Sequence, residues 1–461
     1  MTDFRVCVLG RLPEADPAEI LCALPQAVVP TLLDDSARGH ALLAWNPDRQ
    51  FESRLETPNP ASTVGASPGQ RWPLANQDPA AQLAALAAQE CWSCEADLPL
   101  YGGWLGYFGF AAGHAYLPFP WSAPEPSGLP HAAFLRYPRS LLFRKGETLV
   151  LGPVDGGQAW LQEAEAVFDR AARGREPLRA RPRLASQSSA AAFQAAVASL
   201  RDQIGQGELF QANLSHRLSG PFDASPRHLY AHLRPAQPTQ MSAYCESAHG
   251  QAILSWSPER FLSMRGRRLQ TQPIKGTAPR GNDALADAQQ AAALEYSEKE
   301  RAELTMIVDM ARNDLGRVAV PGSVRVLSSG EVEAFPTLFH RTATIEAQAR
   351  DGVGFADLFA ACFPPASVTG APKVRALQAI AEFEAEDRGP YCGAFGYWIP
   401  GAEQADFSVM IRTAIVSDGQ LHLRVGAGIV WDSDPQHEWE ETLVKARYLQ
   451  ENHEQTPLRS S

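Results

Sequence analysis

The spacing of apolar and polar residues predicts a mixture of helices and strands. Apolar residues recur at helical spacing over 193–204, behind two serines that suit a helix N-cap, whereas over 210–218 they alternate with polar residues as in a half-buried strand. The same criteria predict strands at 251–255, 260–264, 407–416 and 421–430, and helices at 284–315, 355–362, 372–384 and 438–450. Hairpin-like runs of strands, interrupted by a few long helices, predict an α+β fold rather than a regular βαβ winding.

The composition changes most clearly at 173–189. This stretch holds five arginines, two prolines and a serine-rich end, with too few apolar residues to offset the entropy lost on ordering. We therefore expect a linker or surface crossover there. It separates an N-terminal region at 1–172 from a second region at 190–450, in which most of the motifs below lie, and a flexible tail follows at 451–461.

The charge balance restricts the partners of the protein. The 461 residues include 41 Lys and Arg against 52 Asp and Glu, a net charge of −11. A binder of nucleic acid or of an anionic membrane would need a basic face, so we expect neither. No apolar run reaches the roughly 18 residues of a membrane span, and the first residues lack a leader pattern. We therefore expect a cytoplasmic protein that acts on small polar molecules.

The seven cysteines are scattered and do not suggest a disulfide framework. Cys91 and Cys94 have the spacing of a redox pair or of half a zinc site. No second pair follows to complete four ligands, so we expect ordinary thiols.

Two pairs of glutamates on predicted helices are candidate metal ligands. At 100° per residue, Glu300 falls within the apolar arc of its helix and Glu303 about 40° outside it. A second i, i+3 pair, Glu438 and Glu441, lies on the C-terminal helix. Inward carboxylates one turn apart repel each other unless a cation compensates them, and such oxygen donors suit Mg²⁺. The alternative is solvated helix faces or salt bridges to nearby lysines, namely Lys299 and Lys445.

A lysine and a glutamate stand at junctions between predicted elements. Lys275, in the segment PIKGTAPRG at 273–281, lies among Pro, Ile and Gly, where desolvation would suit an amine nucleophile or base. Glu259, at a turn before a strand, suits a general acid. These segments alone leave open a surface lysine and an ion pair between Glu259 and Arg260.

Three further features suit an anionic ligand. Gly426 and Gly428 interrupt an apolar strand, which indicates close approach of backbone or ligand, or else a bulge. The segment SVTGAPK at 367–373 opens a helix whose first turn offers free N–H groups. Arg412 lies among apolar neighbours, which suggests an oxyanion partner or an internal salt bridge. With Lys275, these features predict a dianionic substrate held by arginine, backbone amides and magnesium beside a lysine.

The order of these motifs resembles the chorismate-utilising enzymes, specifically component I of anthranilate synthase and of aminodeoxychorismate synthase. The resemblance covers 193–449, and a looser match at 99–109 extends it into the first half. The matching motifs are GELFQANLS, SPERF, PIKGTAPRG, the AE and DMARND segments of 300–314, SVTGAPK, IRT, GAGIV and EWEETLVK. The family implies an α+β fold of two antiparallel sheets packed together, with helices outside.

The resemblance also implies how the substrate is held. Magnesium would lie near Glu303 and Glu441, with Glu300 and Glu438 in support, and would bridge to the ring carboxylate of chorismate. His340 falls where the family carries a histidine beside the ring. The other residues implied to hold the substrate are Thr369, Tyr397, Arg412, Gly426, Ala427, Gly428 and Lys445.

Lys275 distinguishes the two branches of the family. Anthranilate synthases typically carry alanine in this motif, whereas aminodeoxychorismate synthases carry lysine. The resemblance then implies that Lys275 adds to ring carbon 2 as the carbon 4 hydroxyl leaves, with Glu259 as general acid. Ammonia next enters carbon 4 and expels the lysine, giving 4-amino-4-deoxychorismate, a precursor of 4-aminobenzoate and folate. Leu304, where anthranilate synthases usually carry histidine, fits the same branch.

The ammonia must come from elsewhere, because no cysteine lies in a glutaminase setting. We expect a separate glutamine amidotransferase subunit, or free ammonia. The segment 32–36 resembles the tryptophan-pocket motif of the family with one extra residue, which makes a tryptophan site at Ser36, Met241 and Ser242 a hypothesis. The alternatives are anthranilate synthase component I and a catalytically silent, tryptophan-sensing subunit.

Overall fold

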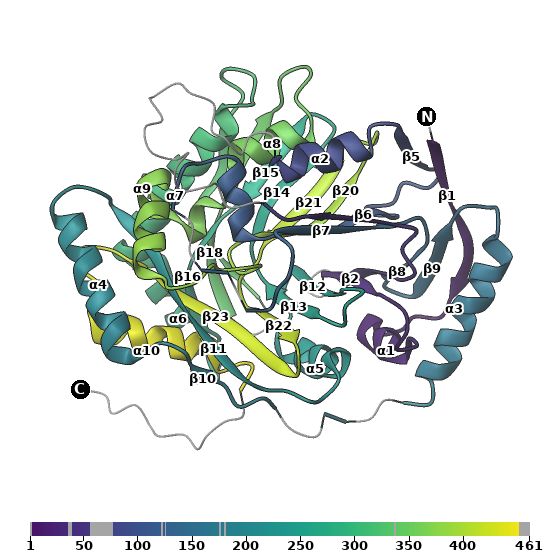
Figure 1. The fold of residues 1–461 in the computed structure, drawn as a ribbon, viewed down its shortest axis with the longest axis horizontal. Helices are drawn as coiled ribbons and strands as arrows, with labels where there is room; N and C mark the ends of the chain where they lie inside the picture. Colours follow the sequence, from purple (N-terminus) through teal and green to yellow (C-terminus); the bar gives the residue numbers. More distant parts are fainter. Residues whose placement is uncertain are drawn as a thin grey trace.

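Two large β-sheets lie face to face in the computed structural model, with helices on their outer sides (Figure 1). Among the described strands, only β1 (Thr2–Leu12) and β5 (Glu90–Cys94) pair in parallel. The predicted α+β fold of two packed antiparallel sheets is therefore confirmed. The structure describes residues 2–35, 39–55, 77–120, 123–124, 126–174, 177–178, 181–335 and 338–450.

The larger sheet has thirteen strands within the described residues. From edge to edge it runs β10 (Ala185–Ser186), β11 (Gln211–Pro221), β23 (Gln420–Ile429), β22 (Thr413–Ser417), β13 (Ala252–Ser257), β12 (Met241–Glu246), β2 (Thr31–Asp35), β3 (His40–Ala44), β8 (Ser140–Arg144), β9 (Glu147–Gly152), β1 and β5, with β19 (Gly370–Ala371) beside β11. The smaller sheet, of ten described strands, runs β16 (Ile274–Pro279), β18 (Leu338–Gln348), β15 (Arg268–Gln272), β14 (Arg260–Arg265), β21 (Gln404–Val409), β20 (Ala394–Ile399), β6 (Gly103–Phe108), β7 (Ala132–Tyr137) and β4 (Arg49–Ser53), with β17 (Arg325–Ala334) beside β18.

Each sheet takes strands from both sides of the segment 173–189. In the larger sheet β12 pairs with β2, and in the smaller sheet β20 pairs with β6. Within the described part of the segment itself, Ala185–Ser186 forms an edge strand of the larger sheet. The two regions on either side of it therefore build one structure together. The predicted tail at 451–461 lies outside the described residues.

The helices cover the outer faces of the two sheets. One end of the larger sheet packs against α1 (Pro17–Ala23), α3 (Gly157–Ala171) and α5 (Pro226–Leu233), and its other end, at β11 and β23, packs against α4 (Ala190–Gly205), α9 (Lys373–Phe383) and α10 (Pro435–Ala446). The smaller sheet packs against α2 (Pro79–Leu86), α6 (Ala284–Tyr296), α7 (Glu298–Gly316) and α8 (Phe355–Cys362), and the short 3₁₀ turns are η3 (Phe110–Ala115), η4 (Arg234–Ala236) and η5 (Ala366–Val368).

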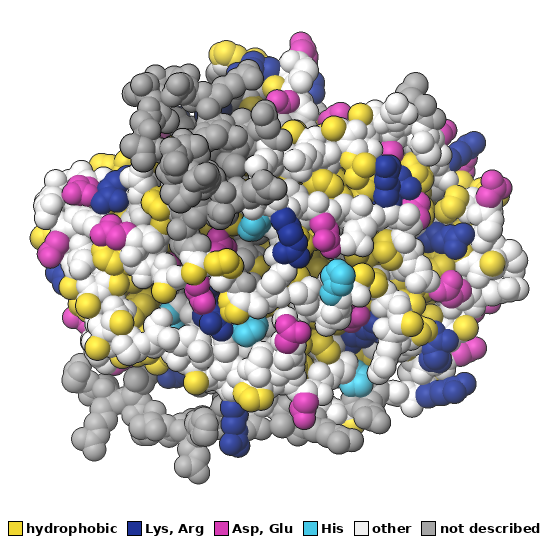
Figure 2. Space-filling view, in the orientation of Figure 1, with side chains coloured by type: hydrophobic (Ala, Val, Ile, Leu, Met, Phe, Trp, Pro, Cys, Tyr) yellow, Lys and Arg dark blue, Asp and Glu magenta, His cyan; other side chains and the backbone are white. Residues whose placement is uncertain are grey.

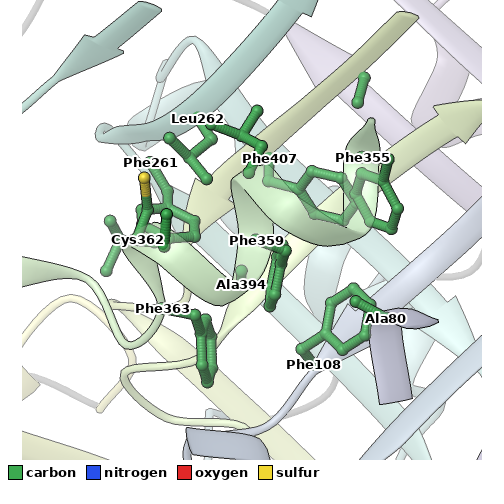
Figure 3. Close-up of a cluster of buried hydrophobic side chains, with 14 of the residues drawn as sticks. Ala80, Phe108, Phe261, Leu262, Phe355, Phe359, Cys362, Phe363, Ala394 and Phe407 are labelled. Atoms are coloured by element: carbon green, nitrogen blue, oxygen red, sulfur yellow. The ribbon is translucent and has the colours of Figure 1, made fainter. Parts of the chain in front are cut away.

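Aromatic side chains fill the space between the smaller sheet and α8 (Figure 3). The ring of Phe359, on α8, lies 4.1 Å from that of Phe108 on β6 and 5.8 Å from that of Phe407 on β21, measured between centroids. Stacked and edge-on aromatic pairs of this kind bury a large apolar area. They hold α8, and the loop that follows it, against the sheet.

Two predicted elements are each divided in the structure. The single helix predicted at 284–315 is wrong at Ser297, whose extended backbone separates α6 from α7 and whose hydroxyl accepts a hydrogen bond from Glu300 N at 3.3 Å. This is an N-cap, which begins α7 anew. The single strand predicted at 407–416 is also wrong, because β21 ends at Val409 and β22 begins at Thr413.

The surface carries charges of both signs. Among the side chains coloured in Figure 2, acidic and basic ones are interspersed and form no broad basic area. Within the described residues, no helix combines the length and the apolar character needed to cross a bilayer.

Candidate active site

A cavity of about 210 Å³ lies between the two sheets, where β11 and β23 face β16 and β18. Its walls bring together residues that are far apart in the sequence. Those that the sequence predicted and that line the cavity are Glu259, Lys275, His340, Arg412, Gly426, Gly428 and Lys445.

Lys275 extends from β16 into this cavity. Its Nζ donates a hydrogen bond to the carbonyl oxygen of Ser367 at 3.2 Å, and its charge acts on both Glu259 and Glu303. The Nζ also lies 3.8 Å from the point where a Cβ on Gly428 would be. Because the side chain lines the cavity, the alternative of a surface lysine is excluded.

Glu259 is a buried carboxyl beside this amine. Its side chain is 3% exposed, and burial raises its pKa to about 7, although a hydrogen bond from Ser367 and the charge of Lys275 act in the opposite direction. A carboxyl with a pKa near neutrality can both hold and release a proton in the physiological range. Arg260 pairs instead with Asp406, Nε to Oδ1 at 2.8 Å, so the predicted alternative of an ion pair with Glu259 is excluded.

Arg412 lies in the turn between β21 and β22. Its backbone has φ = +50°, a conformation that non-glycine residues seldom adopt. Burial lowers the pKa of its guanidinium, and within the described part of the chain no carboxylate pairs with it. The alternative of an internal salt bridge is therefore not found. A buried cation without a counter-ion is costly, and an anionic ligand would relieve that cost.

His340, on β18, faces the same cavity. Burial and the nearby charge of Arg412 lower its pKa to about 3, so the imidazole is neutral at pH 7. Its Nδ1 lies 3.0 Å from the hydroxyl oxygen of Thr277, whereas its buried Nε2 has no hydrogen-bond partner among the described residues. A neutral ring beside the cavity leaves Nε2 available to a ligand.

The two glycines of β23 allow close approach to the neighbouring strand. β11 and β23 pair without a break through both positions, so the alternative of a bulge is excluded. A Cβ on Gly428 would lie 2.4 Å from Gln211 Nε2, and a Cβ on Gly426 would lie 2.8 Å from the Leu214 carbonyl oxygen and 3.0 Å from the Tyr391 hydroxyl. Any side chain here would displace a wall of the cavity.

The four predicted glutamates come from two helices. Glu300 and Glu303 lie on α7, and Glu438 and Glu441 lie on α10. Burial raises the pKa of Glu303, and the charges of Glu300 and Glu441 raise it further. Burial likewise raises the pKa of Glu438, with Glu441 adding to the effect. The two pairs therefore act on each other across the gap between the helices.

Lys445 partly compensates this negative charge. Its Nζ lies 2.6 Å from Glu441 Oε1 and donates to the Gly426 carbonyl oxygen at 2.9 Å. The predicted alternative of a salt bridge is thus realised for this pair, and Lys445 lowers the pKa of Glu441 although burial acts against it.

The carboxylates suit a cation that needs few protein ligands. No group of three His, Cys, Asp or Glu side chains in the described segments is arranged to hold a metal by itself. Magnesium takes one or two carboxylates and completes its shell with water and an anionic substrate. Hard oxygen donors from two facing helices fit that ion, and magnesium stays a prediction.

Three predicted residues do not reach the cavity. The Thr369 hydroxyl is fully buried and donates to the carbonyl oxygens of Pro365 and Ala366, so it supports the loop before α9. The Ala427 side chain packs with α4 and α9 on the opposite face of β23. Tyr397, expected beside Arg412, lies in a different cavity, because its position on β20 faces the other end of the space between the sheets.

Three cavity residues escaped the sequence analysis. Asn213 lines the wall and has a buried Nδ2 without a hydrogen-bond partner among the described residues. The Ser367 side chain forms a hydrogen bond with Glu259, and its carbonyl oxygen accepts one from Lys275. Tyr391 lies against Gly426. Asn213 and Ser367 belong to the motifs GELFQANLS and SVTGAPK, so their presence in those motifs was the available signal.

The cavity that contains Tyr397 has a volume of about 230 Å³ and lies between β2, β3 and β12 of the larger sheet and β14, β20 and β21 of the smaller one. Met241 and Ser242, predicted for a tryptophan pocket, both line it. Asp34 also lines it and is held by Arg234, Oδ2 to Nε at 2.5 Å. Ser36 lies outside the described residues.

The comparisons with known proteins agree with this geometry. The family model described as "chorismate binding enzyme" matches residues 30–451. An aminodeoxychorismate synthase component 1 from Salmonella typhimurium is 38% identical over 357 residues, which cover 77% of each chain. An anthranilate synthase component 1 from Streptomyces coelicolor is 37% identical over 373 residues, covering 76% of this chain and 72% of that protein.

A solved structure shares the fold. The anthranilate synthase component I of Streptococcus pneumoniae superposes with a TM-score of 0.75 at 27% identity, over 89% of this chain and 91% of that one. The chain belongs to the chorismate-binding enzyme family, and the cavity at Lys275 is its candidate active site.

Proposed function

We propose that the protein converts chorismate and ammonia to 4-amino-4-deoxychorismate, as component I of an aminodeoxychorismate synthase. One observation carries this proposal: the amine of Lys275 lies inside the cavity of a chorismate-binding enzyme, next to the buried carboxyl of Glu259. An amine so placed is a nucleophile with an acid beside it.

The proposed reaction has two displacements. In the first, the nitrogen of Lys275 bonds to ring carbon 2, both conjugated ring double bonds shift, and the carbon 4 hydroxyl leaves as water after receiving a proton from Glu259. In the second, ammonia bonds to carbon 4, both ring double bonds shift back, and the carbon–nitrogen bond to Lys275 breaks, which restores the amine. A Glu259 pKa of about 7 suits a group that gives a proton in one step and regains one in the next.

The remaining cavity residues orient the substrate. Arg412 would pair with the enolpyruvyl carboxylate, which supplies the anion that its buried guanidinium lacks. The neutral ring of His340 would lie beside the substrate without adding charge. Magnesium would be held by Glu303 and Glu441, with Glu300 and Glu438 in support, and would bind the ring carboxylate. Lys445 would then release the oxygen of Glu441 that it now pairs with.

The ammonia would come from a glutamine amidotransferase subunit. The related proteins named above are each called component 1, which implies a second component. Tryptophan is the ligand we propose for the second cavity, at Met241 and Ser242. The α-ammonium group of tryptophan would meet acidic residues there, namely Asp34 and Asp35.

Product analysis tests the proposal against its rival. The enzyme is incubated with chorismate, magnesium and ammonium, and the products are identified by mass spectrometry while anthranilate fluorescence is followed. No lyase is added. Under these conditions we expect 4-amino-4-deoxychorismate as the product and no anthranilate fluorescence. Strong fluorescence would instead establish anthranilate synthase activity, which relatives of similar identity carry in their name.

A further inference from the structure

The active-site cavity is lined by a tyrosine that the sequence analysis did not single out and that the proposed reaction does not use. Tyr448 follows the end of α10, one turn beyond Lys445, and both side chains line the cavity. The Tyr448 hydroxyl is buried and has no hydrogen-bond partner among the described residues. A buried hydroxyl without a partner is destabilising, so its presence in a binding cavity indicates that a ligand supplies the partner.

Tyr448 lies beside Arg412, the buried arginine that has no carboxylate partner in the described part of the chain. The two groups act on each other electrostatically, although no hydrogen bond joins them. Burial raises the pKa of Tyr448, and the charge of Arg412 acts in the opposite direction without cancelling the rise. The phenol therefore keeps its proton at neutral pH and remains a hydrogen-bond donor.

Trp256, on β13, fixes the positions of both groups. Its backbone N–H donates to the carbonyl oxygen of Arg412 at 3.1 Å, in the turn between β21 and β22. Its indole ring packs edge-on against the ring of Tyr448, with 5.7 Å between the centroids. The guanidinium and the hydroxyl are thus held beside one space before a ligand binds, which reduces the entropy lost on binding.

The other tyrosines near this site are less suited to the same position. Tyr397, which the resemblance implied beside Arg412, lies in the second cavity. Tyr391 lines the active-site cavity, but its hydroxyl forms a hydrogen bond with Cys392 and lies against Gly426. Among the described tyrosines of this cavity, Tyr448 is the one with an unpaired hydroxyl.

We propose that the Tyr448 hydroxyl donates a hydrogen bond to the substrate carboxylate that Arg412 binds. The guanidinium then compensates the charge of the carboxylate, and the phenol adds a second donor that fixes its orientation. The inference rests on the proposed function, in which Arg412 pairs with the enolpyruvyl carboxylate of chorismate. A substrate analogue without that carboxylate would leave both donors unpaired, so the site would select against it.

Tyr448→Phe tests the proposal, because it removes one oxygen and keeps the ring against Trp256. Tyr107→Phe is the matched control. It also removes a buried hydroxyl, but one that donates to the Pro130 carbonyl oxygen at 3.0 Å and does not line the active-site cavity. Without ligand, we expect Tyr448→Phe to unfold at or above the temperature of the parent, and Tyr107→Phe to unfold at a lower temperature. An equal loss in both variants would mean that the Tyr448 hydroxyl already has a partner within the protein, which overturns the proposal.

Binding of two aromatic analogues is then measured by calorimetry with magnesium present. The first, 3-(1-carboxyvinyloxy)benzoate, carries both carboxylates of chorismate, whereas 3-(prop-1-en-2-yloxy)benzoate has a methyl group in place of the enolpyruvyl carboxylate. We expect Tyr448→Phe to weaken binding of the dicarboxylate about tenfold or more, because a hydrogen bond to a charged group is lost. Binding of the methyl analogue should stay within about twofold of the parent, as should binding of both analogues to Tyr107→Phe. If Tyr448→Phe weakened both analogues equally, or neither, the proposal would be overturned.

The Arg412→Gln variant shows whether the two residues bind the same group. In that background, Tyr448→Phe should weaken binding of the dicarboxylate by less than about threefold, because the carboxylate is no longer held next to the hydroxyl. An undiminished tenfold effect would place the hydroxyl against a different part of the substrate and contradict the proposal.

Product formation separates failure of this inference from failure of the proposed function. If the parent makes the amino product and Tyr448→Phe binds the dicarboxylate as tightly as the parent, only the role of Tyr448 is wrong. If the parent makes no amino product, the proposed function fails. If Arg412→Gln also binds the dicarboxylate as tightly as the parent, the proposed placement of the substrate is wrong and the role of Tyr448 fails with it.

Discussion

The two cavities between the sheets are similar in size but differ in how their charges are compensated. The second cavity, of about 230 Å³, has Asp34 held by Arg234 and Arg260 held by Asp406. The active-site cavity, of about 210 Å³, contains Arg412, which lacks a carboxylate partner among the described residues. Asp34 and Arg260 of the second cavity thus each have a partner of opposite charge, whereas Arg412 of the active-site cavity does not.

The difference supports the proposed location of the chemistry, in the cavity at Lys275. Burying a charge without a partner costs several kcal/mol, so a protein that keeps one gains something from it when the ligand arrives. At the active site, the unpaired guanidinium, the partly protonated Glu259 and the Lys275 amine face one space. At the second cavity the paired charges shape a binding site and provide no group free to react.

Removing the reactive amine should have the largest effect. We expect Lys275→Ala to lower the rate of 4-amino-4-deoxychorismate formation by about 10³-fold or more, because the covalent step is lost. Chorismate binding, measured by equilibrium dialysis, should change far less. The exposed Lys145→Ala serves as control. If Lys275→Ala formed the amino product at the normal rate, the active-site cavity would no longer be distinguished from the second cavity by its reactive amine.

The two arginines should respond in opposite ways. Arg412→Gln should raise KM for chorismate about 10- to 100-fold, because hydrogen bonds to charged groups contribute about 1.5–3 kcal/mol, with little loss of stability. Arg260→Gln should instead lower the free energy of unfolding by about 2–3 kcal/mol, because it leaves Asp406, which is only 13% exposed, without its partner. Urea unfolding and chorismate kinetics are measured on both. If both variants changed KM and the free energy of unfolding to the same extent, the proposed difference between a paired and an unpaired arginine would be contradicted.

The pH profile should report Glu259. Burial raises its pKa to about 7, and the first displacement needs its acid form. Above pH 7 the proton is lost, so we expect kcat to fall by about tenfold per pH unit between pH 8 and 9. In Glu259→Gln, whose activity is low, this decline should be absent. A parent profile that stays flat to pH 9 would show that another group supplies the proton.

Changes in the second cavity should have the smallest effect on turnover. Ser242→Leu places apolar bulk in that cavity and should weaken tryptophan binding, measured by calorimetry, by about tenfold or more. Chorismate turnover without tryptophan should stay within about twofold of the parent, because no catalytic group lies there. An equal loss of tryptophan binding and of chorismate turnover would mean that the two cavities are not separate sites.

The motifs predicted several residues that the structure brings together around one cavity, among them Glu259, Lys275 and Arg412. The helical spacing predicted Glu300 within the apolar arc of its helix and Glu303 beside it, and both side chains are half-buried. Such a placement depends on local geometry, which the sequence encodes directly. The same applies to the class of the fold, since alternating and helical spacing are local signals. The junction predicted for Lys275 is wrong, because 274–279 forms strand β16, from which Lys275 extends into the cavity.

The remaining errors concern how distant segments meet. Tyr397 and Tyr391 are six residues apart, yet only Tyr391 reaches the active-site cavity. Which cavity each tyrosine reaches depends on the part of the larger sheet that lies opposite each end of β20. No local sequence pattern contains that information. Arg412 was expected within a strand, but its φ of +50° turns the chain there. That conformation is imposed by the surrounding sheets and not by the residue type.

The central claim is that Lys275 forms a covalent bond to the substrate, and intact-protein mass spectrometry tests it most directly. The protein is incubated with chorismate and magnesium in the absence of ammonium, and the adduct is located by peptide mapping. We predict a mass increase equal to chorismate less one water, carried by the peptide that contains Lys275 and lost when ammonium is added. An unmodified Lys275 in a protein that makes its amino product once ammonium is present would contradict the account.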